Sequence, residues 1–91
     1  MLLETKTAVR LAKEWLAGQM SDEGISEIGL EEVRWKDGAW EITLGFSRPW
    51  DTDNDLGLRV TGITTRKRTY KVLVIDDEKM SVVEMRDREA A

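Results

Sequence analysis

Hydrophobic positions near the start of the chain recur every three or four residues, which predicts an amphipathic helix over residues 4–20. Thr5 suits the N-cap position, and Gly18 followed by the polar run 21–24 ends the pattern. Charged side chains fall on the opposite side of this helix, so one face is expected to pack and the other to meet solvent. The packing stripe runs through Ala8, Ala12, Trp15, Leu16, Gln19 and Met20.

Residues 33–46 change to an alternating pattern around Asp37-Gly38, the pair preferred in two-residue type I′ hairpin turns. Ile28 and Leu30 are out of phase with the later positions of the first strand. This predicts either a bulge near residues 31–32 or a separate short strand. Pairing the strands about the turn sets Lys36 opposite Ala39, Trp35 opposite Trp40, and Val33 opposite Ile42.

The second half of the chain alternates again over residues 58–75, and the run 76–79 has the composition of a turn. A last strand is expected over residues 80–86, where the hydrophobic positions fit two phases. One helix followed by a four-stranded antiparallel meander predicts an α+β fold, the cystatin-like roll, in a single domain over residues 1–91. Tyr70, Val72 and Val74 share one face of their strand, and Leu73 and Ile75 share the other.

Composition narrows the classes of function. The 91 residues contain no histidine and no cysteine, which removes the commonest general base, the strongest nucleophile and the usual zinc ligands. An enzyme is therefore not expected, nor is a cofactor. The net charge of −4 disfavours general nucleic-acid binding. No signal-peptide pattern and no membrane-spanning run is present, so a cytoplasmic protein is expected.

An acidic stretch offers a candidate metal site. Asp51, Asp53 and Asp55 fill the first, third and fifth positions of a calcium-binding loop. Leu56 stands where that loop needs glycine, and Gly62 stands where it needs a bidentate glutamate. The alternative is a strand-connecting loop whose aspartates occupy turn positions.

Trp50, which follows Arg48 and Pro49, lies outside the alternating pattern of the preceding strand. An exposed tryptophan at this place would be an interface anchor, because tryptophan is enriched among interface hot spots. The alternative is that Trp50 folds back and covers an open end of the core.

A basic stretch covers residues 65–71. Arg66 and Arg68 project on the same strand face as Tyr70, where they could grip a phosphate or a pair of carboxylates. The alternative is a solvated strand end whose charges discourage edge-to-edge aggregation. We take Trp50, Arg48, Arg66, Arg68 and Tyr70 as the candidate partner-binding residues.

Residues 37–50 (DGAWEITLGFSRPW) and 70–88 (YKVLVIDDEKMSVVEMRDR) resemble the gas vesicle protein O family and small PepSY-type domains. The resemblance implies an assembly or accessory role rather than catalysis. We therefore expect a non-enzymatic protein-interaction module that binds another protein as an accessory or inhibitory partner, or pairs with itself through its sheet. The alternative is a small calcium- or ligand-binding domain that uses the acidic loop 51–55.

Overall fold

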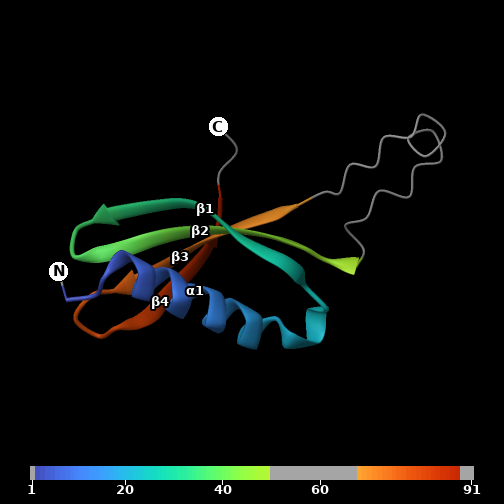
Figure 1. Ribbon diagram of the computed structural model, residues 1–91, viewed down its shortest axis with the longest axis horizontal. Helices are drawn as coiled ribbons and strands as arrows, with labels where there is room; N and C mark the ends of the chain where they lie inside the picture. The colour runs from blue at the N-terminus through green and yellow to red at the C-terminus, as the bar shows by residue number, and fades with distance from the viewer. Residues whose placement is uncertain (1, 50–67, 89–91) are drawn as a thin grey trace.

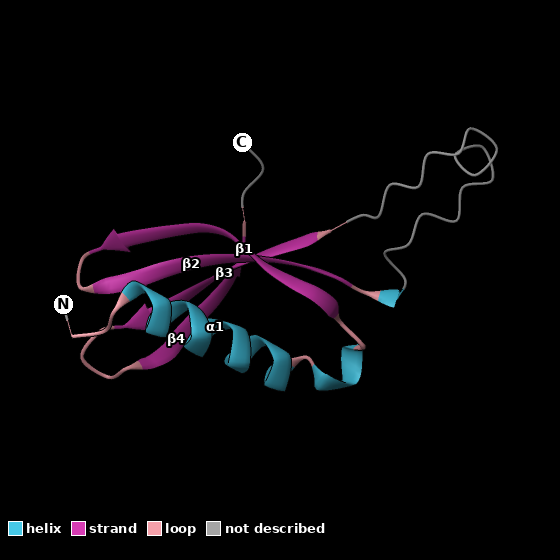
Figure 2. Cartoon of the chain, viewed as in Figure 1, coloured by secondary structure: helices cyan, strands magenta, loops and turns pink. Residues whose placement is uncertain are grey.

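The computed structural model describes residues 2–49 and 68–88, and shows one helix packed on one face of a four-stranded antiparallel sheet (Figures 1 and 2). The strand order β1-β2-β3-β4 follows the chain, so the sheet is a meander. The predicted α+β fold is confirmed. The elements are α1 (Thr5–Gln19), the short 3₁₀ helix η1 (Ser21–Glu23), β1 (Ser26–Lys36), β2 (Ala39–Ser47), β3 (Thr69–Asp76) and β4 (Ser81–Asp87).

The helix buries the predicted stripe. Ala8, Ala12 and Leu16 are fully buried against the sheet, as their spacing predicts. The N-cap prediction is wrong by one residue, because Glu4 occupies that position and its side chain makes no capping hydrogen bond. The carbonyl of Glu4 accepts the first helical hydrogen bond from the Ala8 N–H at 3.0 Å.

The hairpin between β1 and β2 has the predicted turn and register. Asp37 and Gly38 have φ values of 50° and 78°, as a type I′ turn requires at both central positions. Trp35 lies opposite Trp40, and the two rings meet edge-on with centroids 5.0 Å apart. The local turn preference and the hydrophobic alternation thus specify the same pairing.

Bulges interrupt both edge strands. In β1 the register shifts between Leu30 and Glu32, so the strand is continuous and bulged rather than divided in two. A second shift lies near the start of β1, where Glu27 has a φ of 57°. In β4 a shift places Val83 outside the ladder, which resolves the two phases of that strand: Val82 and Met85 both pack against the core.

The core lies between α1 and one face of the two central strands. Strand β2 contributes alternate residues to it, and β3 contributes Leu73 and Ile75. No described element covers the opposite face of the sheet (Figure 2). The buried apolar residues of the core are Leu3, Ala8, Ala12, Leu16, Met20, Trp40, Ile42, Leu44, Phe46, Leu73 and Ile75.

Replacing glycine with alanine at two positions, one in the turn and one in the helix, tests the assigned turn. Gly38→Ala forces a side chain into the left-handed region and is expected to destabilise the fold by about 1–2 kcal/mol. Gly18→Ala lies within α1 and meets no atom within 4 Å, so a gain of up to about 1 kcal/mol is expected. Chemical denaturation of both variants measures the difference. Equal effects at the two sites would contradict the assigned turn.

Candidate interaction surface

Strand β1 is a long and exposed edge. It has eleven residues, and none of them is buried. Leu30 and Trp35 keep 44% and 40% of their surface exposed, although both lie on the helix side of the sheet. An edge strand with exposed apolar side chains is a template for pairing with another strand.

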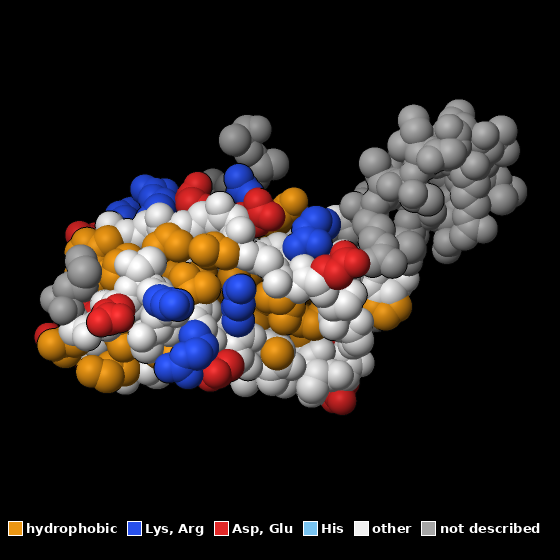
Figure 3. All heavy atoms as spheres, in the orientation of Figure 1, with side chains coloured by type: hydrophobic (Ala, Val, Ile, Leu, Met, Phe, Trp, Pro, Cys, Tyr) orange, Lys and Arg blue, Asp and Glu red, His pale blue; other side chains and the backbone are white. Residues whose placement is uncertain are grey.

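The apolar residues beside this edge form a strip between α1 and β1. We call Val9, Leu30, Val33 and Trp35 the β1 strip. Figure 3 shows hydrophobic side chains at the surface between the helix and the β1 side of the sheet. The helix leaves this strip partly open, so a strand added at β1 would cover it.

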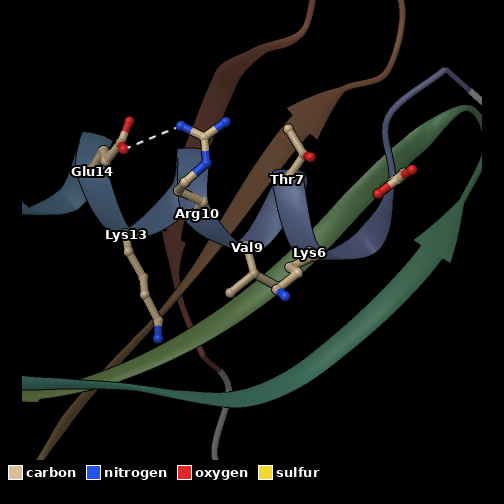
Figure 4. A pocket seen from close by; sticks show the side chains of 7 residues that line it. Lys6, Thr7, Val9, Arg10, Lys13 and Glu14 are labelled. Atoms are coloured by element: carbon tan, nitrogen blue, oxygen red, sulfur yellow. Dashed lines mark hydrogen bonds and ion pairs between the residues drawn. The ribbon is translucent and has the colours of Figure 1, made fainter.

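Basic side chains border the strip. Figure 4 shows Lys6, Val9 and Lys13 projecting from α1 toward the strands, with Arg10 and Glu14 on the other side of the helix. Arg10 pairs with Glu14 at 3.3 Å in a solvent-exposed i,i+4 contact. These side chains line a hollow of 470 Å³ along α1, whose exposed walls are mainly the aliphatic stems of charged residues.

The turn geometry decides which backbone groups of β1 point outward. The Asp77 N–H donates to the Gly38 carbonyl at 3.2 Å, which makes Ala39 and Asp76 a non-hydrogen-bonded pair. The N–H and C=O of Ala39 therefore point to Lys36 in β1. Alternation then directs the backbone groups of Lys36, Arg34 and Glu32 toward β2, and those of Trp35 and Val33 outward.

We call the sheet face opposite α1, which no described element covers, the open face. Two of the predicted binding residues lie together on it. Tyr70 pairs with Gly45, and a Cβ on that glycine would stand 2.8 Å from the Tyr70 ring. Arg68 extends past the same glycine and donates to the Glu27 carbonyl at 2.8 Å. Arg88 stacks its guanidinium over the Tyr70 ring, 5.3 Å from the centroid. The open face thus carries an arginine on each side of one tyrosine.

The other predicted residues are not part of this group. Arg48 stacks on Phe46, 5.5 Å from the ring centroid, and Phe46 faces the helix. Arg48 is therefore on the opposite side of the sheet from Tyr70. The candidates that lie outside the described residues are Trp50, Arg66, Asp51, Asp53 and Asp55.

An ion-pair network occupies the centre of the open face. Arg86 donates to Glu41 and to Glu84, at 2.7 Å in both cases. The hydrogen bond from Arg86 lowers the pKa of Glu41, and the bond to Glu41 raises the pKa of Arg86. Beside this network is a hollow of 450 Å³ where Thr43 and Val72 are buried.

A buried carboxylate ties the start of the chain to the two turns. Asp77 accepts hydrogen bonds from the N–H groups of Leu2 and Leu3, the latter at 2.8 Å. These bonds, that of Leu3 first, lower the pKa of Asp77. Asp76 accepts from the N–H groups of Glu78 and Lys79 and so shapes the β3–β4 turn.

In the described part of the chain no three acidic side chains lie close enough together to hold a metal ion. No helix between residues 2 and 49 or 68 and 88 is long and apolar enough to cross a membrane.

Comparisons with protein families, with curated proteins and with solved structures find no match. The resemblance to gas vesicle protein O and to PepSY-type domains therefore stays a prediction.

The exposed part of β1 is the feature that sequence reasoning missed. Alternation about the turn predicts that Trp35 lies opposite Trp40, as it does, but alternation does not tell a central strand from an edge. The only signal was the length of a first strand that has a neighbour on one side in a meander.

Arg68 is expected to contribute to stability through its contact with Glu27. Removing the side chain in Arg68→Ala leaves the left-handed Glu27 without this hydrogen bond, and a loss of about 1 kcal/mol is expected. Arg10→Ala is the matched control, because its exposed pair is worth only about 0.3–0.5 kcal/mol. Urea denaturation compares the two variants. A loss at Arg68 no larger than at Arg10 would show that the contact is unimportant.

Asp77 should make stability depend on acidic pH. Its pKa is lower in the folded state than the ordinary value of about 3.9, so the unfolded chain binds more protons in acid. The stabilisation is complete above the unfolded pKa and is lost as the pH falls through the folded pKa. Asp77→Asn should melt below wild type at neutral pH, and the difference should shrink as the pH is lowered from about 5 into the acidic range below the ordinary aspartate pKa of about 3.9. Thermal melts across that range measure it, and a constant difference would contradict the assignment.

Proposed function

We propose that the protein is a non-enzymatic protein-interaction module that binds its partner by strand addition at β1. The observation that carries the proposal is the exposure of Leu30 and Trp35 on an eleven-residue edge strand. Strand addition supplies main-chain hydrogen bonds along the edge, and side-chain pockets on alternate positions supply selectivity. The β1 strip provides such positions on its helix side.

The energy available at this edge is consistent with recognition. Covering the exposed part of Trp35 removes on the order of 100 Å² of apolar surface from water, which contributes about 2 kcal/mol. The outward N–H and C=O groups of Val33 and Trp35 gain partners at the same time. Tryptophan is enriched among interface hot spots, so Trp35 suits the role of an anchor at this edge.

The open face offers a secondary contact region. This region has two positive charges and an aromatic ring, supplied by Arg68, Arg88 and Tyr70. Such charges orient an acidic partner and add little to its affinity. Trp50 and Arg66 remain predicted to contribute to binding of the same partner. The cytoplasmic location, the cystatin-like relationship and the calcium-binding alternative at Asp51, Asp53 and Asp55 also remain predictions.

A proline in the edge strand tests the proposal. Val33→Pro removes one outward N–H without touching the ladder to β2, because proline is tolerated where the N–H faces away from the sheet. Affinity capture with wild-type protein should recover a partner, identified by mass spectrometry, and Val33→Pro should lose it. A melting curve of the variant checks that the sheet remains folded. Equal recovery by both proteins would remove β1 as the binding element.

Matched lysine substitutions in β1 and β4 show which edge strand binds the partner. Leu30→Lys and Val83→Lys each replace an apolar side chain that is about half exposed, one on β1 and one on β4. The proposal expects capture to fail with Leu30→Lys and to persist with Val83→Lys. The reverse result would move the binding element to β4.

A further inference from the structure

We propose that the strand that pairs with β1 is β1 of a second copy of this chain, antiparallel, with a two-fold axis at Val33. This inference rests on the proposed function, because it names the partner of the same edge. It follows from the direction of the backbone groups, from the charges along β1 and from the apolar residues beside them.

Two registers pair Val33 with a residue of the second copy that also directs its backbone groups outward. Val33 and Trp35 direct their N–H and C=O groups outward, so they must occupy the hydrogen-bonded positions of the new ladder. One register then has its axis at Val33, with Val33 opposite Val33 of the second copy. The other has its axis at Arg34, with Val33 opposite Trp35 of the second copy.

Charge selects the register with its axis at Val33. There Glu32 lies opposite Arg34 of the second copy, and by symmetry the pair occurs twice. Both side chains are exposed on the open face, and opposite charges across a non-hydrogen-bonded pair attract at close range. The other register also forms two opposite-charge pairs, between Glu32 and Lys36 of the second copy, but it sets Arg34 directly opposite Arg34 at the axis, which is repulsive.

The apolar residues fit the same register. The two Val33 side chains meet at the axis on the helix side. Trp35 then comes next to the bulged segment of the second copy, where Leu30 is exposed. The β1 strips of both copies thus become one covered band, with the lysines of α1 at its border.

The bulge limits the strength of the dimer. It ends the regular part of β1 at Glu32, so with the axis at Val33 the regular ladder is only three residues per copy, from Glu32 to Arg34, and is smaller than a standard stable interface. A dissociation constant in roughly the micromolar range is therefore expected. Sedimentation must accordingly extend to concentrations of about 100 μM or more.

Single cysteines report the register directly, because the chain has none of its own. With the axis at Val33, the two Val33 Cα atoms are about 5.5 Å apart, within disulfide range. Oxidation should therefore convert Val33→Cys to a covalent dimer and leave Arg34→Cys monomeric. Crosslinking of Arg34→Cys alone would overturn the proposed register.

Exchanging the charges of Glu32 and Arg34 tests their pairing across the dimer without introducing a disulfide. Glu32→Arg and Arg34→Glu each create two like-charge pairs and should weaken dimerisation by about five-fold or more in sedimentation. The double variant Glu32→Arg/Arg34→Glu should return to the wild-type constant. No recovery in the double variant would contradict the charge pairing.

The outcomes separate this inference from the function on which it rests. Wild-type protein that stays monomeric at the highest concentration overturns self-pairing. If Val33→Pro still loses a captured partner in that case, strand addition at β1 stands with a different occupant. If Val33→Pro alters neither self-association nor capture, both proposals are wrong.

Discussion

The two-residue turn at Asp37-Gly38 determines how the rest of the sheet is used. Its left-handed backbone fixes Lys36 opposite Ala39, and the pairs from there to Glu32 opposite Thr43 follow from that one. The same pair decides which side chains meet the helix and which backbone groups of β1 point away from β2. A shift by one residue would exchange the two faces, exposing the core of β2 and turning the outward groups of Val33 and Trp35 inward.

The size of the helix explains why β1 is left exposed. An α-helix with its side chains is about 10 Å wide, whereas the outer strands of a four-stranded sheet are about 14 Å apart between axes. A single helix therefore covers the two central strands and only part of the edges. Leu16, which faces the sheet, is therefore fully buried, while Trp35 on the edge strand keeps two-fifths of its surface exposed to solvent. The apolar strip is thus a consequence of the architecture as well as a candidate site.

Sequence patterns predicted the parts of this fold that depend on local chemistry. The Asp37-Gly38 turn, the helix stripe and the shared face of Arg68 and Tyr70 all follow from neighbouring residues and their spacing. The exposure of Trp35 depends on how far the helix reaches across the sheet, and that is a tertiary quantity. The separation of Arg48 from Tyr70 likewise depends on which side of the sheet the chain leaves after β2.

The two edge strands, β1 and β4, differ in the side-chain interactions that an added strand would meet. Both carry a bulge, which protects an edge by interrupting its ladder. In β4 the residues beyond the bulge are already engaged, since Arg86 bridges two carboxylates and Asp87 pairs with Lys71. A strand added there would come close to these partly exposed ion pairs and would have to leave them in place or replace them. In β1 the regular stretch after the bulge presents Glu32 and Arg34 toward solvent, where an opposite charge can meet each of them. The bulge of β4 is thus accompanied by ion pairs along the strand, whereas the bulge of β1 is followed by a regular stretch, and this difference is the reason that we propose β1 rather than β4 as the edge for association.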